Sequence, residues 1–267
     1  MASPDYSILD RPDVLSVLFH PRREPAGTGS GRDISIPVGT DHTIGARAHM
    51  GPVDGPTILF FHGNGEIVAD YDDLGPLYNS LGINLLAVDY RGYGRSSGTP
   101  SVAAMMTDCH RILPFCEDWF HQHRYSGPLI LMGRSLGSAS ALELAAAYPD
   151  RVHGLILESA FAYAAPLLRL LGIDPEQIGF KEAAGFANLD KIKAYAGPTL
   201  IIHAEYDHII PYADSEALFA ASPARNKRRV KIPGANHNDI FLRGMTPYLD
   251  ALQTFCRSCL ASQTGAM

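Results

Sequence analysis

The stretch that decides the fold is Gly133-Arg134-Ser135-Leu136-Gly137. It lies between an apolar run that predicts a β-strand, Leu129 to Met132, and a run that predicts a helix, Ser138 to Tyr148. A strand that turns directly into a helix strains the residue at the centre of the turn, and flanking glycines remove the side chains that would clash there. The pattern therefore predicts a nucleophile elbow, with the Ser135 hydroxyl held above a sheet and beside the positive end of a helix.

A serine hydroxyl needs a base within hydrogen-bond reach and a third group that orients this base. Downstream of Ser135, the apolar run Pro198 to His203 predicts a buried parallel strand, and Asp207 follows its end. A second predicted strand, Arg229 to Ile232, leads into a polar loop that contains His237. Loops at the carboxyl ends of parallel strands meet in one crevice, so we expect these three side chains to form a Ser-His-Asp triad.

Other acids and histidines compete for these roles. Glu205 is the alternative acid, although it lies one step from the strand, where it can face solvent. His203 lies inside the predicted strand, and His208 follows Asp207 too closely to bridge to the serine. We therefore favour Asp207 as the acid and His237 as the base.

A tetrahedral intermediate needs donors for its oxyanion, usually two main-chain N–H groups. The residue after the nucleophile, Leu136, supplies one of them. The second should come from the loop after an early strand, and Thr57 to Phe61 is such a strand, followed by His62-Gly-Asn-Gly-Glu66. We expect Asn64 to donate through its main chain, and His62 to hold this loop in place rather than to act in catalysis.

Five motifs, taken together, carry a resemblance to a known family. In order along the chain they are His62-Gly-Asn-Gly65, Asp89-Tyr-Arg-Gly-Tyr-Gly-Arg-Ser-Ser-Gly98, Gly133-Arg-Ser-Leu-Gly137, Pro198-Thr-Leu-Ile-Ile-His203 with Asp207 and Pro211, and Gly234-Ala-Asn-His-Asn-Asp-Ile240. With these residues the chain resembles the serine hydrolases of the α/β-hydrolase superfamily, and more narrowly its Bem46 and ABHD17-like branch. The resemblance implies an α/β-hydrolase fold: a mostly parallel eight-stranded sheet flanked by helices, with a small helical cap insertion.

The pattern changes at about residues 160–196, where hydrolases of this fold carry their caps. The segment Phe161 to Leu171 is apolar almost all round, so it is buried or covers something apolar. We interpret it as a small cap in which four residues line an acyl pocket: Phe161, Tyr163, Leu167 and Leu168. The alternative is an ordinary crossover helix packed on the sheet.

Composition limits the remaining possibilities. The chain has 267 residues, of which 46% are hydrophobic and 19% charged, which suits one α/β domain over residues 31–267 after an N-terminal segment, 1–30, that is partly loop. No run is long and apolar enough to predict a membrane span, and a net charge of −6 argues against nucleic-acid binding. The spacing of the four cysteines suits neither a disulfide within one helix nor a zinc site, so we expect reduced thiols and a cytoplasmic protein.

The predicted reaction is acyl transfer in two steps, through an acyl-enzyme on Ser135. We expect hydrolysis of a small-molecule carboxylic ester with a short or medium acyl chain, with no cofactor and no metal. Three alternatives remain: an acyl thioesterase, a serine aminopeptidase-like hydrolase, and a homologue that binds ligands without turnover.

Overall fold

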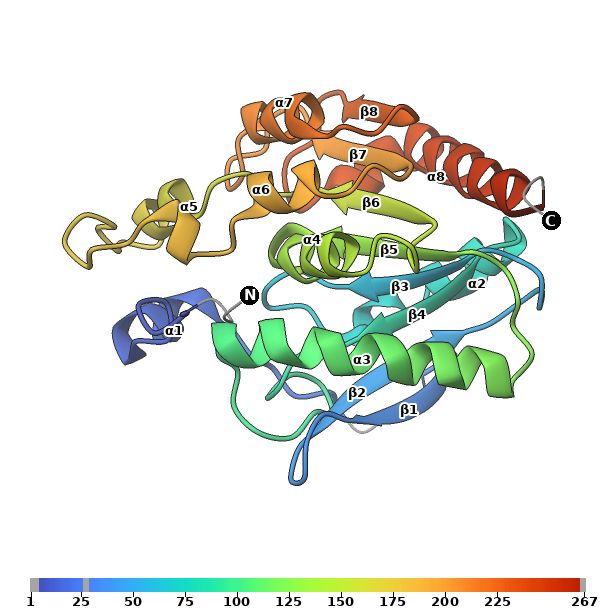
Figure 1. The fold of residues 1–267 in the computed structure, drawn as a ribbon, viewed down its shortest axis with the longest axis horizontal. Helices are drawn as coiled ribbons and strands as arrows, with labels where there is room; N and C mark the ends of the chain where they lie inside the picture. The colour runs from blue at the N-terminus through green and yellow to red at the C-terminus, as the bar shows by residue number, and fades with distance from the viewer. Residues whose placement is uncertain (1–4, 26–28, 265–267) are drawn as a thin grey trace.

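The fold is built on one twisted sheet, whose strands lie side by side in the computed structural model of residues 5–25 and 29–264 (Figure 1). Its strands are β1 (Arg32–Pro37), β2 (Thr43–His49), β3 (Thr57–Phe61), β4 (Asn84–Val88), β5 (Leu129–Arg134), β6 (Gly154–Glu158), β7 (Thr199–Ala204) and β8 (Lys227–Ile232). They form an eight-stranded sheet in the order β1-β2-β4-β3-β5-β6-β7-β8. Strand β2 runs antiparallel to β1 and β4, and the remaining neighbours pair in parallel. The predicted fold class, a mostly parallel eight-stranded sheet flanked by helices, is confirmed.

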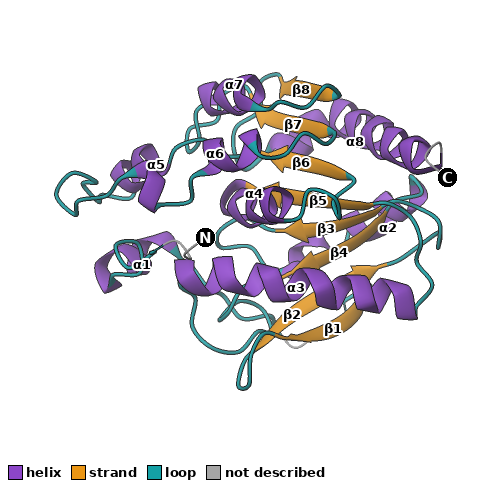
Figure 2. Cartoon of the chain, in the orientation of Figure 1, coloured by secondary structure: helices purple, strands orange, loops and turns teal. Residues whose placement is uncertain are grey.

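Helices cover both faces of the sheet (Figure 2). They are α1 (Pro12–Leu18), α2 (Leu74–Ser80), α3 (Val102–Gln122), α4 (Ser138–Ala147), α5 (Ala164–Leu170), α6 (Asn188–Lys193), α7 (Tyr212–Ala221) and α8 (Ile240–Thr264), with short 3-10 turns at Val68–Tyr71, Ser135–Gly137 and Glu182–Ala184. Helices α3, α4, α6 and α7 lie on one face, and α2 and α8 lie on the other (Figure 1).

The central strands are buried on both faces, which explains their continuous apolar sequence. In β3 all five residues are buried. Alternation sends Leu59 and Phe61 into the core beneath α3 and α4, whereas Ile58 and Phe60 pack into the core beneath α2 and α8. The buried sheet therefore fixes the positions of the loops that follow the carboxyl ends of its strands.

Helix α1 is a feature that the residue pattern does not predict. Only Val14 and Leu18 of its seven residues are buried, too few for a recognisable helical period. The N-terminal segment 1–30, expected to be partly loop, falls in part on residues 1–4 and 26–28, which lie outside the described residues.

The segment between β6 and β7 combines both arrangements considered for it. Helix α6 packs beside α4 and α7 as a crossover helix does. Helix α5 instead lies beyond the carboxyl ends of the strands, on the same side as α1 (Figure 1). Its position is the one a cap would take, and the cap itself stays a prediction.

All four cysteines are free and buried: Cys109, Cys116, Cys256 and Cys259. Burial raises the pKa of Cys259 to about 11, which keeps this thiol protonated and unreactive at neutral pH. Within residues 5–25 and 29–264, no helix has the length and apolar character needed to cross a bilayer.

Candidate active site

The turn between β5 and α4 has the tight geometry expected of an elbow. Ser135 has φ of 50°, in the left-handed region that costs a non-glycine residue on the order of 1–3 kcal/mol. A Cβ on Gly133 would lie 2.5 Å from the Gly137 carbonyl oxygen, and one on Gly137 would lie 2.0 Å from the Phe61 carbonyl oxygen. Both glycines are therefore required by close backbone approach, and the turn packs directly on the end of β3.

Three side chains from separate strand ends meet at this turn. His237 Nε2 lies 3.0 Å from Ser135 Oγ, and His237 Nδ1 lies 2.7 Å from Asp207 Oδ2. The histidine is almost fully buried, and the Asp207 side chain is completely so. The structure thus brings together the three residues that the sequence nominated, in the order serine, imidazole, carboxylate. Their role in catalysis stays a prediction.

The Asp207 carboxylate is held ionised by its surroundings. Burial acts to raise its pKa, but the hydrogen bond from His237 and those from the amides of Ile209 and Ile210 outweigh burial and lower the pKa of Asp207. The amides lie 3.0 and 2.8 Å from Oδ1. One carboxylate oxygen is thereby fixed by the loop, and the other contacts the His237 imidazole at 2.7 Å, with His203 Nε2 further away at 3.5 Å.

The competing residues have other partners. Glu205 accepts a hydrogen bond from the Gly234 amide at 3.0 Å and pairs with Lys231, so it joins the acid loop to the histidine loop instead of contacting His237. His203 bonds the Ile210 carbonyl through Nε2 at 2.9 Å, and burial lowers its pKa. His208 is exposed.

The loop after β3 is anchored from two directions. His62 is fully buried, and its ring nitrogens contact the Gly63 carbonyl at 2.8 Å and Asp89 Oδ1 at 3.1 Å, which suits the structural role expected for it. Among the described residues, the main-chain N–H of Asn64 has no hydrogen-bond partner. This N–H and that of Leu136 stay the predicted oxyanion donors.

The side chain of Asn64 has a function that the sequence does not reveal. Its Nδ2 donates to the Leu18 carbonyl at 2.8 Å, and its Oδ1 accepts from the His20 amide at 2.9 Å and the Tyr93 hydroxyl at 2.7 Å. Arg22 adds a bond from Nε to the Gly65 carbonyl at 2.8 Å. The segment after α1 is thus tied to the loop that carries the proposed oxyanion donor.

An apolar cavity of about 100 Å³ lies beside Ser135. The residues that line it are Leu18, Asn64, Ser135, Leu136, Phe161, Ala164, Leu167, Leu168, Leu170, Leu171, Phe186 and Ile209. Three of the four residues nominated for an acyl pocket are among them, so α1 and α5 supply opposite parts of its wall.

Tyr163 is the exception, because it is not among the residues that line this cavity. It directly precedes the first residue of α5, and its backbone is extended. Its side chain is 41% exposed. Leu18 and Phe186, which do line the cavity, come from distant segments and carry no local signal.

We also searched the described residues for a set of metal ligands. Within the part of the chain that the structure describes, no group of three or more His, Cys, Asp or Glu side chains is arranged to hold a metal ion.

The sheet order, the elbow and the loops at the strand ends define the class of protein: an α/β hydrolase. A family model described as Serine aminopeptidase, S33, matches residues 55–177. An uncharacterised protein of Mycobacterium tuberculosis is 29% identical over 258 residues, covering 90% of this chain and 85% of the relative.

Two further relatives belong to the branch that the motifs resemble. Alpha/beta hydrolase domain-containing protein 17B of Xenopus laevis is 32% identical over 210 residues, which cover 74% of this chain and 65% of the relative. Protein bem46 of Schizosaccharomyces pombe is 29% identical over 196 residues, which cover 72% and 64% respectively. The chain belongs to the α/β-hydrolase superfamily and is similar to these proteins, so the expected resemblance is confirmed.

Solved structures agree on the fold. The Pyrococcus furiosus esterase Pf2001 superposes with a TM-score of 0.71 at 16% identity, covering 90% of this chain and 99% of that one. The complex of ferulic acid with Est1E from Butyrivibrio proteoclasticus gives a TM-score of 0.69 at 21% identity, covering 85% and 99%.

Proposed function

We propose that this α/β hydrolase cleaves carboxylic esters of short acyl chains, with Ser135 as nucleophile. The observation that carries the proposal is the unbroken contact from Ser135 Oγ to His237 Nε2 at 3.0 Å and from His237 Nδ1 to Asp207 at 2.7 Å, at the mouth of an apolar cavity. In this reaction Ser135 attacks the ester carbonyl as His237 accepts its proton. The amides of Asn64 and Leu136 stabilise the oxyanion, and His237 returns the proton to the departing alcohol.

Water then completes the cycle. His237 removes a proton from water, the hydroxide attacks the acyl carbonyl, and the Ser135 oxygen leaves with the proton that His237 carried. Asp207 stays ionised throughout and stabilises the charged imidazole. No step requires an additional group.

The cavity supports an acyl substrate of limited size. An apolar cavity of about 150 Å³ accommodates benzene, so a cavity of about 100 Å³ accommodates an acyl chain of about four carbons. Its lining contains no charged residue, which is unfavourable for the protonated amino end of a peptide. An ester substrate is therefore preferred to an aminopeptidase substrate. The cytoplasm is the proposed location, because it keeps thiols such as the four free cysteines reduced.

Two measurements test this function. A fluorophosphonate probe should label the wild-type protein and leave Ser135→Ala unlabelled. A panel of p-nitrophenyl esters, from acetate to decanoate, should show highest kcat/KM at about four carbons. A protein that is neither labelled nor active on any member of the panel would be a binding homologue, and the proposal would be wrong.

A further inference from the structure

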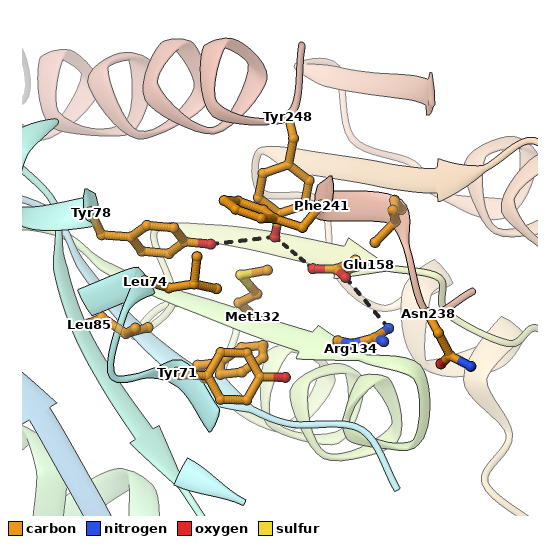
Figure 3. A pocket seen from close by; sticks show the side chains of 12 residues that line it. Tyr71, Leu74, Tyr78, Leu85, Met132, Arg134, Glu158, Asn238, Phe241 and Tyr248 are labelled. Atoms are coloured by element: carbon orange, nitrogen blue, oxygen red, sulfur yellow. Dashed lines mark hydrogen bonds and ion pairs between the residues drawn. The ribbon is translucent and has the colours of Figure 1, made fainter. Parts of the chain in front are cut away.

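The residue immediately before the nucleophile, Arg134, is at the centre of a buried network on the opposite side of the sheet from the acyl cavity. Arg134 ends β5, and its side chain enters a cavity of about 90 Å³ between α2 and α8, together with Glu158, Tyr71, Tyr78 and Tyr248 (Figure 3). A guanidinium in such a site must be paired, because an isolated buried charge is very costly.

The partners of Arg134 belong to the other loops of the active site. Its Nε lies 2.9 Å from Glu66 Oε1, and its Nη2 donates to the main-chain carbonyl of His237 at 3.1 Å. Glu66 is in the loop after β3, and its Oε2 accepts from the Gly63 amide at 2.7 Å and the Tyr71 hydroxyl at 2.5 Å. The side chain of Arg134 therefore touches the loop of the proposed oxyanion donor and the loop of the proposed base, and its main chain is joined to Ser135 by a peptide bond.

The second carboxylate, Glu158, has a different relation to Arg134. Arg134 Nη1 lies 3.5 Å from Glu158 Oε1 and makes no hydrogen bond within the described residues. Glu158 instead accepts from the Tyr248 hydroxyl at 2.6 Å, in the chain of contacts drawn in Figure 3. Burial raises the pKa of Glu158, whereas for Glu66 the charge of Arg134 and the Tyr71 hydroxyl outweigh burial and lower the pKa. Glu66 is thus the closer of the two ion-pair partners, at 2.9 Å against 3.5 Å for Glu158.

We propose that Arg134 is a positioning residue that sets the distance between nucleophile, base and oxyanion donor by holding Glu66 and the His237 carbonyl at once. This inference rests on the proposed function. The three loops follow different strands, so a contact between them is needed to fix their relative positions. A shift of about 1 Å between reacting groups can lower the rate on the order of a hundredfold. A planar guanidinium suits the task, since its donors are fixed relative to one another, whereas a lysine ammonium on a flexible stem cannot hold both acceptors in register.

The test compares Arg134→Lys, Glu66→Gln and the double variant with a matched control. Glutamine at 66 keeps one acceptor for the Gly63 amide and removes the charge paired with Arg134. The control is Arg91→Lys, because Arg91 pairs with Asp108 through two bonds of 2.7 Å yet touches none of the three loops. Each protein is assayed for kcat and KM on the best ester, for the rate of fluorophosphonate labelling, and for Tm.

We expect Arg134→Lys and Glu66→Gln each to lower kcat and the labelling rate about 10- to 100-fold, with KM within about threefold of wild type. The double variant should lose no more than the worse single variant, because the two residues act as one unit. Arg91→Lys should lower Tm while kcat stays within about twofold. If Arg134→Lys does not fold, Glu66→Gln alone decides.

Two outcomes are separable. If wild type is labelled and active but Glu66→Gln loses no more kcat than Arg91→Lys, the positioning role is wrong and the proposed function stands. If wild type itself is neither labelled nor active, the proposed function is wrong, and the positioning role that rests on it is wrong as well.

Discussion

The side-chain amide of Asn64 donates to the main-chain carbonyl of Leu18 at 2.8 Å, which joins the loop after β3 to the end of α1. The same residue is proposed to stabilise the oxyanion through its main chain. Leu18 in turn lines the apolar cavity beside Ser135. One residue therefore couples the shape of the acyl site to the position of a proposed oxyanion donor.

This coupling predicts that Asn64→Ala impairs turnover although it leaves every main-chain amide in place. Losing the bonds to Leu18, His20 and Tyr93 removes the contacts that hold the loop. We expect kcat to fall about tenfold, which corresponds to an increase in activation free energy on the order of 1–1.5 kcal/mol. Asn79→Ala serves as the control, since its side chain bonds two carbonyls far from the site. Equal kcat values for the two variants would show that the Asn64 side chain has no part in turnover.

Ser135→Ala should remove essentially all esterase activity, by on the order of 10⁴-fold or more, without unfolding the protein. Asp207→Asn should cost less than His237→Ala, because a misoriented imidazole is a milder defect than a missing one. Glu205→Gln should change kcat by less than about threefold, since its carboxylate bonds Gly234 instead of the imidazole. Initial rates and circular dichroism of all four variants provide the check. More than a tenth of wild-type activity in Ser135→Ala would remove this serine from the mechanism.

Chain-length selectivity should depend on α5. Shortening Leu167 or Leu168 to Ala enlarges the cavity. Each methylene that a longer substrate then buries contributes about 0.8 kcal/mol of binding free energy, so kcat/KM should rise about tenfold for each pair of added carbons. The measurement is the ratio of octanoate to butyrate hydrolysis beside Tm. Leu242→Ala is the control, because Leu242 is 80% exposed and absent from the cavity lining. An unchanged ratio with lowered stability would mean that α5 packs as core and does not shape the acyl site.

The pH profile should show one acid limb. The mechanism starts from neutral imidazole, so kcat/KM should rise between about pH 5 and 8. Asp207 does not contribute a limb in this range, because its lowered pKa keeps the carboxylate ionised there. Activity that stays level down to about pH 4, or that is abolished by EDTA, would indicate different chemistry.

Acid stability should depend on Glu143 of α4, which contacts His110 at 3.0 Å and Lys191 at 2.7 Å. Burial opposes its charge, but these partners outweigh burial and lower the pKa of Glu143 from 4.5 to about 2. A lowered folded-state pKa means that ionised Glu143 stabilises the protein above about pH 4.5, and that this contribution is lost as the pH falls towards 2.

Glu143→Gln should therefore lower the free energy of unfolding at pH 7 by about 1–2 kcal/mol, a figure reduced for solvent screening, and the difference should narrow by pH 3. Urea denaturation at both pH values measures it. The exposed pair of Asp190 with Lys193 supplies the control, since Asp190→Asn should change stability by less than about 0.5 kcal/mol. If the difference in free energy of unfolding between wild type and Glu143→Gln were larger at pH 3 than at pH 7, the predicted stabilisation by ionised Glu143 would be wrong.

The residues predictable from sequence are those whose roles depend on local chain order. Ser135, Asp207 and His237 each follow a recognisable strand, and parallel pairing alone brings strand ends to one edge of the sheet. Strand β8 extends to Lys227, two residues before the predicted start, because its cationic side chains hide the strand pattern.

The unpredictable residues depend on side-chain reach across the fold. Arg134 and Glu66 are 68 positions apart, and nothing in either motif shows that they pair. Leu18 lines the cavity from the end of α1, where its carbonyl accepts a hydrogen bond from the distant Asn64 side chain. Tyr163 shares the apolar run of its neighbours, yet it is 41% exposed and absent from the cavity lining, which the run alone does not show.

Strand β8 has a consequence for how copies of this protein can assemble. It is the last strand of the sheet, and it carries Lys227, Arg228, Arg229 and Lys231 among its six residues. Two copies that joined their sheets through this edge would place rows of cations opposite one another, and like charges in facing strands repel. These charges therefore make this edge of the sheet unfavourable for strand pairing with a second copy of the protein.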